Sequence, residues 1–141
     1  MKMTRLCGLL SAILVLCSCN DKIEVQQEYD FSLSTWYLQK TILPNAPVEI
    51  RFYLTRAGYF EDAEYSISYT QIEGKGIVTD TGNKPLVNRE YRELKDIPGL
   101  EDGVFTLYYR STSTKNSTLR FTVRDNFGNE RELQIEFQNE T

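Results

Sequence analysis

One triplet in the chain has the residue types of a catalytic motif. Asp80-Thr81-Gly82 is the order that aspartic proteases use, where two such carboxylates share a proton inside a dry cleft. A single triplet could act in this way only in a dimer. Asn83 follows the triplet in place of a small residue, and Pro85 comes soon after. Because Gly, Asn and Pro are typical turn residues, we expect Asp80–Pro85 to be a turn rather than a catalytic site.

The composition excludes most other catalytic chemistry. The chain has 141 residues and no histidine, so histidine bases, Ser-His-Asp triads and the ordinary zinc sites are ruled out. The acidic stretches Glu61–Glu64 and Glu101–Asp102 lack the alternating oxygen ligands of a calcium loop. Gly74-Lys75-Gly76 lacks the spacing of a phosphate loop and is expected to be a hairpin turn. We therefore expect no enzyme activity, no cofactor, no metal and no small-molecule substrate.

The net charge argues against nucleic acid as a direct partner. The chain has 20 acidic and 16 basic residues, and its formal net charge of −4 is the wrong sign for binding a phosphate backbone. The apolar fraction of 40% is sufficient for a packed core, and the length suits one domain. We therefore expect partners that are proteins or a membrane.

Nine tyrosines and one tryptophan are the residues best suited to binding. A tyrosine ring offers rigid apolar area with a polar tip, which favours interfaces, but tyrosine also favours β-strands. About half of the tyrosines fall on the apolar side of alternating segments, where they would fill a core. The aromatic residues left as candidates for contact with a partner are Trp36, Tyr53, Tyr59, Phe60 and Tyr108.

The first residues of the chain have the organisation of a targeting signal. Lys2 and Arg5 give a positive start, and the apolar run from Leu6 to Leu16 is too short to span a membrane. The run ends at Leu16-Cys17-Ser18-Cys19, an order that resembles the cleavage signal of bacterial lipoproteins. In those proteins a lipid is attached to the cysteine that becomes the first residue. We therefore expect lipid on Cys19, which would hold the protein at a membrane without spanning it.

The alternative is an ordinary secretory signal in which the cysteines have no role. Cys19 is the only cysteine outside the signal, so a secreted domain could form no internal disulfide with it. Lipid attachment explains this single thiol and places the protein in the bacterial cell envelope, on a periplasmic or surface face. The expected parts are a lipoprotein signal peptide over 1–18, an acylated cysteine and flexible tether over 19–28, and one domain over 29–141.

The domain has the alternation of apolar and polar residues that is typical of β-strands. Val48 to Leu54, Tyr65 to Tyr69 and Phe105 to Tyr109 each place every second residue on an apolar side. The phase of this alternation changes at Trp36, which favours a bulge or a crossing between sheets. Leu86 to Leu94 alternates more weakly and is expected to be an edge strand. About seven strands in a domain of this length favour an all-β fold, an antiparallel β-sandwich.

The last two segments predict a hairpin across a turn at Asp125–Arg131. One register pairs the apolar residues on one side, namely Leu119 with Phe137, Phe121 with Ile135, and Val123 with Leu133. The same register places opposite charges across from each other on the other side, namely Arg124 with Glu132 and Arg120 with Glu136. Gly128 falls at the centre of the turn, where a positive φ is required.

Two stretches carry a resemblance to a known fold. Leu100 to Tyr108 resembles the corner and penultimate strand of bacterial immunoglobulin-like domains, although Phe105 stands where those domains often have a tyrosine. Phe121 to Asn129 resembles their closing hairpin. The resemblance implies an immunoglobulin-like sandwich, and it says little about function because this fold has many roles.

A second resemblance covers the whole chain. It is carried by the lipoprotein-like start, the short tether, the opening Phe31-Ser32-Leu33-Ser34-Thr35-Trp36, the strand from Pro47 to Leu54, the Tyr59-Phe60 loop and the turn from Arg124 to Glu130. These features resemble the TraQ family of Bacteroides conjugative transposons. The resemblance implies membership of a mating apparatus that moves DNA between cells, with other proteins of that apparatus as partners. It carries no catalytic residues.

These expectations describe a non-enzymatic envelope lipoprotein that serves conjugative transfer through protein–protein binding, as an accessory or assembly component. The alternative is a carbohydrate-binding β-sandwich lipoprotein at the surface or in the periplasm. That alternative requires a flat aromatic patch around Trp36 or Tyr59.

Overall fold

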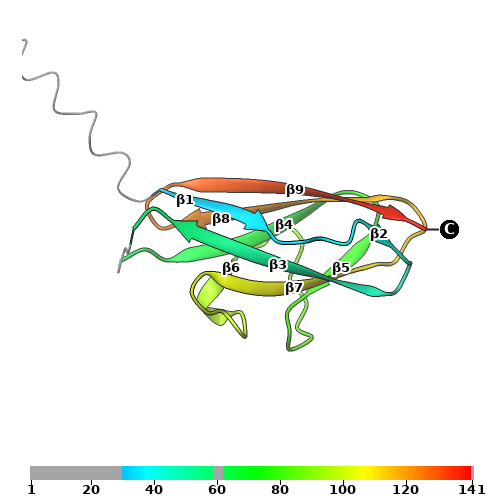
Figure 1. Cartoon of the computed structure of the whole chain (residues 1–141), viewed down its shortest axis with the longest axis horizontal. Helices are drawn as coiled ribbons and strands as arrows, with labels where there is room; N and C mark the ends of the chain where they lie inside the picture. The colour runs from blue at the N-terminus through cyan, green and yellow to red at the C-terminus, as the bar shows by residue number, and fades with distance from the viewer. Residues whose placement is uncertain (1–29, 59–61, 141) are drawn as a thin grey trace, which may run out of the picture.

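The computed structural model describes residues 30–58 and 62–140, which form two packed β-sheets (Figure 1). The elements in chain order are β1 (Phe31–Thr35), β2 (Thr41–Ile42), β3 (Pro47–Arg56), β4 (Tyr65–Glu73), β5 (Gly76–Thr79), β6 (Arg92–Glu93), the 3-10 turn η2 (Leu94–Asp96), β7 (Val104–Ser111), β8 (Ser117–Asp125) and β9 (Glu130–Asn139). Within these described residues, no helix has the length and apolar character needed to cross a membrane.

The strand order is that of an immunoglobulin-like sandwich. The first sheet has the order β1-β3-β7-β5, and the second has the order β2-β9-β8-β4-β6. When the seven longer strands are lettered A to G along the chain, the sheets read ABED and GFC, which is the immunoglobulin arrangement. The predicted all-β sandwich is confirmed. The structure adds two strands of two residues each, β2 and β6, and β2 pairs with β9 in parallel while the other pairs are antiparallel.

The core lies between the sheets and is built from the apolar side of each alternating strand. Val48, Ile50, Phe52 and Leu54 of β3 are buried, as the period of two predicts. Aromatic contacts join the two layers, because the Phe52 ring lies 5.0 Å from that of Phe105 in its own sheet and 4.9 Å from that of Phe121 in the other. Burial raises the pKa of the Tyr69 phenol in this core above its ordinary value, and the neighbouring Tyr109 raises it further.

The change of phase at Trp36 marks a crossing between the sheets, which was one of the two predicted alternatives. Phe31 and Leu33 of β1 are buried and pair within the first sheet. The chain leaves that sheet after Trp36, whose amide still donates to the Arg51 carbonyl of β3 at 3.1 Å, and reaches the second sheet at Thr41, where β2 lies beside β9. Trp36 is 61% exposed at the start of this crossing.

The final hairpin forms, but the predicted register is wrong by two residues. Leu119 pairs with Ile135 and Phe121 with Leu133, so Arg124 lies opposite Glu130 rather than Glu132. The predicted pair Arg120 with Glu136 is also wrong, because Gln134 lies opposite Arg120 and Thr118 opposite Glu136.

A tight turn explains the difference in register. The Asp125 amide donates to the carbonyl of Asn129 at 3.0 Å, and the Asp125 carboxylate accepts hydrogen bonds from the amides of Phe127 and Asn129 at 2.9 and 2.8 Å. These bonds close a three-residue loop in place of the longer turn that was expected. Gly128 has a φ of 91°, as its predicted place in the turn requires. The parity of the apolar residues is the same in both registers, so the core face was predicted correctly.

The edge strand expected over Leu86–Leu94 is mostly a loop. Only Arg92 and Glu93 pair with β4, as the edge strand β6. The loop covers the same edge of β4 in another way: the Arg89 amide donates to the Tyr69 carbonyl at 2.8 Å, and the Gln71 amide donates to the Asn88 side chain at 3.1 Å. Arg89 adopts a φ of 70°, which a continuous strand cannot accommodate.

Candidate functional site

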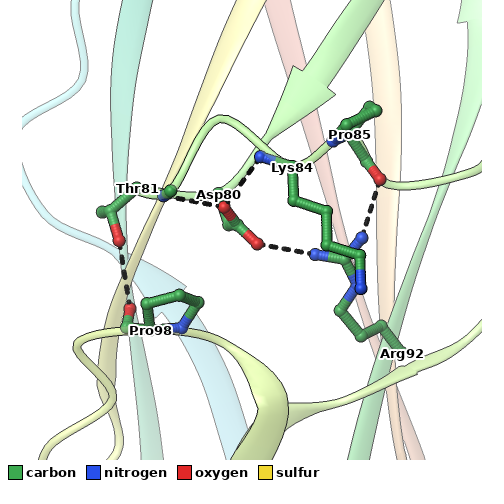
Figure 2. Close-up of polar contacts among 7 residues, drawn as sticks. Asp80, Thr81, Lys84, Pro85, Arg92 and Pro98 are labelled. Carbon is green, nitrogen blue, oxygen red and sulfur yellow. Dashed lines mark hydrogen bonds and ion pairs between the residues drawn. The ribbon is translucent and has the colours of Figure 1, made fainter.

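The Asp80 triplet is a turn, as the sequence predicts. Asp80 is 2% exposed, and its Oδ1 accepts hydrogen bonds from the amides of Gly82 and Lys84 at 2.8 and 3.0 Å. Its Oδ2 forms an ion pair with Nη1 of Arg92 at 2.9 Å (Figure 2). Arg92 also donates to the carbonyl of Pro85 at 2.7 Å. The carboxylate is therefore engaged in holding the turn and β6 together.

Acidic residues elsewhere do not assemble a metal site in the part of the chain that the structure describes. Over 30–58 and 62–140, no three His, Cys, Asp or Glu side chains lie close enough together to hold a metal ion.

The outer face of the first sheet carries three of the five aromatic residues proposed for binding. Tyr53 of β3 and Tyr108 of β7 lie on the side opposite the buried residues of their strands, and both are half-buried. Trp36 follows β1, and its ring lies 5.6 Å from the guanidinium of Arg51, a third outward residue of the sheet. We call Trp36, Tyr53 and Tyr108 the aromatic face.

The register separates these three residues along the sheet. Tyr53 lies opposite Val104, whereas Tyr108 lies opposite Glu49. At about 3.4 Å per residue, the four residue steps from Val104 to Tyr108 correspond to about 14 Å. The aromatic face is therefore an extended surface with several contact points and not a single stacked cluster.

Two hollows open on this surface. One, of about 370 Å³, is lined by Trp36, Tyr37, Gln39, Val48, Glu49 and Arg51. The other, of about 560 Å³, is lined by Pro47, Thr79, Thr81, Asn83, Tyr108 and Arg110. Each combines an aromatic ring with at least one arginine, a combination that is enriched where proteins bind proteins.

Arg51 connects the charged and aromatic parts of the first hollow. Its guanidinium lies against the Trp36 ring and forms an ion pair with Glu49 at 3.3 Å. The cation–π contact is worth about 0.5–1 kcal/mol at an exposed site, which is enough to favour one orientation of the Trp36 ring. Tyr37, which the sequence analysis did not select, is 88% exposed beside it. Its position directly after the phase change was the signal that could have identified it.

Three other predicted site residues cannot be placed. Tyr59, Phe60 and Cys19 lie outside the described residues. The lipid attachment site and the aromatic loop after Gly58 therefore stay predictions, as do the boundaries of the signal peptide and the tether.

The outer face of the second sheet has a different character. β8 contributes Thr118, Arg120, Thr122 and Arg124, and β9 contributes Glu130, Glu132, Gln134 and Glu136. The Arg124 guanidinium lies 3.7 Å from the centre of the Tyr91 ring. This face is made of hydroxyl groups, arginines and carboxylates.

Three solved structures from Bacteroides are similar to this chain, and two of them are described as proteins of conjugative transposons. The chain is similar to a conjugative transposon lipoprotein from Bacteroides eggerthii, with 28% identity and a TM-score of 0.67 over 77% of this chain and 97% of the other. It is also similar to a lipoprotein from Bacteroides thetaiotaomicron, with 34% identity and a TM-score of 0.69 over 86% and 89% of the two chains. A conjugate transposon protein from Bacteroides vulgatus has 28% identity and a TM-score of 0.65 over 84% and 91%.

Sequence comparison identifies the family. No curated protein matches the chain significantly. The model of the TraQ conjugal transfer protein family, in contrast, matches residues 2–140 and so covers the N-terminal segment together with the sandwich. This chain belongs to the TraQ conjugal transfer protein family.

Proposed function

We propose that this protein is a lipid-anchored, non-enzymatic component of a conjugative transfer apparatus that acts by binding other proteins of the apparatus. The observation that carries the proposal is the family match over residues 2–140. It is supported by the similar chain from Bacteroides eggerthii, which is described as a conjugative transposon lipoprotein. It is also supported by the carboxylate of the protease-like triplet, which is engaged in a turn.

The proposed anchor is a lipid on Cys19. Support comes from the order Leu16-Cys17-Ser18-Cys19 after an apolar run and from two similar chains that are described as lipoproteins. A lipid there would hold the sandwich at a membrane of the cell envelope, close to the surface because only a short tether intervenes.

The proposed binding surface is the aromatic face, together with Tyr37 and Arg51. Trp36 and Tyr37 are adjacent and are 61% and 88% exposed, and contiguous exposed apolar surface, unlike a single exposed side chain, marks interaction sites. Tryptophan, tyrosine and arginine are also the residues that contribute most to protein–protein affinity. The net charge of −4 disfavours direct contact with the transferred DNA, so the connection to transfer runs through proteins.

Carbohydrate binding is the second candidate, since Trp36 lines an open hollow. Sugar rings stack on flat, uncovered aromatic faces, and the Arg51 guanidinium lies over the Trp36 ring. A protein surface with a carboxylate could engage Arg51 and Trp36 together. The arrangement therefore favours a protein partner over a glycan.

Gene deletion followed by complementation tests this function. We expect the transfer frequency of the host element to collapse on deletion and to recover with the wild-type gene. Cys19→Ser should fail to restore it and should shift the protein from the membrane fraction to the soluble fraction, without palmitate label. Unchanged transfer after deletion would contradict the transfer role, and unchanged membrane retention of Cys19→Ser would contradict the anchor. Binding of the purified domain to a glycan array, abolished by Trp36→Ala, would favour the second candidate.

A further inference from the structure

The second sheet has a long strand at its rim. β9 extends from Glu130 to Asn139, and Figure 1 shows it along one side of the sandwich. β8 pairs with β9 on one side along the strand. On the other side β2 covers only Gln138 and Asn139. Within the described residues, most of that side of β9 therefore has no strand hydrogen-bonded to it, although β1 of the first sheet lies close by.

The backbone direction of β9 can be read from the hydrogen bonds at its two ends. At the start, the carbonyl of Asn129 points toward β8, where it accepts from the Asp125 amide. At the end, the Gln138 amide points away from β8 and donates to the Lys40 carbonyl at 2.8 Å. Because successive residues of a strand alternate in direction, the amide and carbonyl groups of Glu132, Gln134 and Glu136 point to the open side. No hydrogen bond among the described residues occupies those groups.

The beginning of the same edge is closed. Nη1 of Arg131 donates to the Glu130 carbonyl at 2.7 Å, and Nε of Arg131 donates to the Phe31 carbonyl of β1 at 2.9 Å. Arg131 also forms an ion pair with Asp30. With Arg131 at one end and β2 at the other, the open edge is limited to Glu132, Gln134 and Glu136.

The side chains of these three residues determine which strand the edge could accept. All three are exposed on the outer face, and two are carboxylates. A second copy of this chain would bring glutamates close to glutamates if it paired edge to edge, which is unfavourable. A strand with lysine or arginine at alternate positions would place a cation beside each carboxylate.

A hollow at the end of the edge adds a second acidic contact. It has a volume of about 390 Å³ and is lined by Lys40, Glu73, Asn116, Ser117, Thr118, Glu136, Phe137 and Gln138. Glu73 of β4 and Glu136 of β9 both border it, so a long basic side chain entering the hollow would meet two carboxylates. Lys40 is the single cation among the lining residues.

We propose that the edge formed by Glu132, Gln134 and Glu136 binds an extended segment of a partner protein that carries lysine or arginine at alternate positions. The segment adds a strand to the second sheet, so its backbone bonds to β9 and its basic side chains pair with the carboxylates. This surface is separate from the aromatic face. The inference goes beyond the proposed transfer role because it names a second binding surface and the chemistry of its partner. It can be tested with purified protein alone.

Synthetic peptides provide the probe. A soluble peptide that alternates lysine with valine should bind the purified domain, and its affinity should fall as salt is raised. A peptide with glutamate in place of lysine should not bind. A third peptide keeps the lysines but replaces the valines with proline, which retains the charge and prevents strand pairing. Equal binding of the proline peptide would overturn the proposal, because the contact would then be electrostatic only.

One substitution removes the open amide without disturbing the pairing with β8. Gln134→Pro deletes an N–H that points outward, a position where an edge strand tolerates proline. We expect it to weaken binding of the lysine peptide about tenfold or more, whereas the matched control Gln134→Ala should bind as the wild type does. An unchanged melting temperature verifies that the proline variant is folded.

A measurement on the wild-type protein keeps the test independent of any variant. Amide exchange at Glu132, Gln134 and Glu136 should slow when the lysine peptide is present, while exchange at the aromatic face stays unchanged. Absence of slowing at these three amides, with the peptide bound, would overturn the proposal. Failure here leaves the transfer experiment unaffected, so the two proposals can fail separately.

Discussion

The two sheets share a core and have outer faces of different chemistry. The outward residues of the first sheet include Tyr53 and Tyr108, with Trp36 at its margin. The outward residues of the second sheet are mainly threonine, arginine and glutamate, as along β8 and β9. Inward positions in both sheets are mainly apolar, because both must bury one side of each strand, and polar residues such as Ser111, Ser117 and Asp125 lie at the strand ends.

This difference distinguishes inward positions, where folding requires apolar residues, from outward positions, where it places little demand on residue type. A sandwich needs every second residue to be apolar and places little demand on the others. The polar face of the second sheet is what solubility alone would favour. Outward aromatic residues on the first sheet are not explained by solubility, and the proposed partner contact would explain them. We therefore propose binding through aromatic contacts on one sheet and, at the β9 edge, binding through backbone and charge on the other.

The largest expected effect is on the core that both sheets share. Phe52→Ala should lower the free energy of unfolding by about 3–5 kcal/mol, because Phe52 contacts aromatic rings in both sheets. Urea unfolding measures this value, and the exposed neighbour Thr55→Ala provides the control. A loss below about 1 kcal/mol would mean that the sheets are coupled elsewhere.

The next largest effect on the free energy of unfolding is expected for the buried ion pair of Arg92 with Asp80, in comparison with the exposed pair of Lys95 with Glu93. Arg92→Met should cost about 3 kcal/mol, because it keeps much of the side-chain volume and leaves the buried Asp80 carboxylate without its cation. Lys95→Met breaks an exposed, solvent-screened pair with Glu93 and should leave the free energy of unfolding almost unchanged. Equal losses in urea unfolding would contradict the structural role assigned to Asp80.

Alkaline pH should lower the free energy of unfolding, because the buried Tyr69 phenol loses its proton. Its pKa is raised in the folded protein by burial, so the folded state holds the proton more tightly than the unfolded state does. Stability is therefore complete below the ordinary tyrosine pKa of about 10 and is lost as the pH rises through the higher folded value. Unfolding measured between pH 8 and 11 should show this loss, and Tyr69→Phe should reduce it. An identical pH profile for Tyr69→Phe would contradict this explanation.

The smallest effect is expected for the aromatic face itself. Trp36→Ala and Tyr108→Thr should each change the free energy of unfolding by less than about 1 kcal/mol, since outward cross-strand contacts contribute little. A similar result is expected for Thr70→Ser on the outer face of the second sheet. If the aromatic variants were strongly destabilised, these rings would be part of the fold, and the main argument for a partner would be lost.

The side of each strand that faces the core could be predicted from the sequence, because it depends on the local alternation of apolar and polar residues. Val48 to Leu54 and the two strands of the final hairpin show apolar residues at every second position, and each such series faces the core. The crossing at Trp36 was visible for the same reason, since it breaks the phase.

The register and the edges depended on interactions that alternation does not report. Asp125 shortened the final turn through its own hydrogen bonds and moved every predicted pair by two residues. The Leu86–Leu94 segment became a loop because Asn88 and Arg89 bond to β4 without pairing as a strand. The open edge of β9 could not be predicted either, because it follows from how β2 pairs.

The most direct test of the central claim compares the two outer faces in the living cell. A deletion strain is complemented with Trp36→Ala, Tyr53→Thr and Tyr108→Thr combined, or with Ser66→Thr, Thr70→Ser and Arg120→Gln combined on the second sheet. Both proteins should accumulate in the membrane fraction at the wild-type level. We expect the aromatic variant to lose transfer by at least about tenfold, as a loss of about 1.4 kcal/mol in partner binding would cause, and the control to transfer normally. Equal transfer by the two variants would contradict a partner-binding role for the aromatic face.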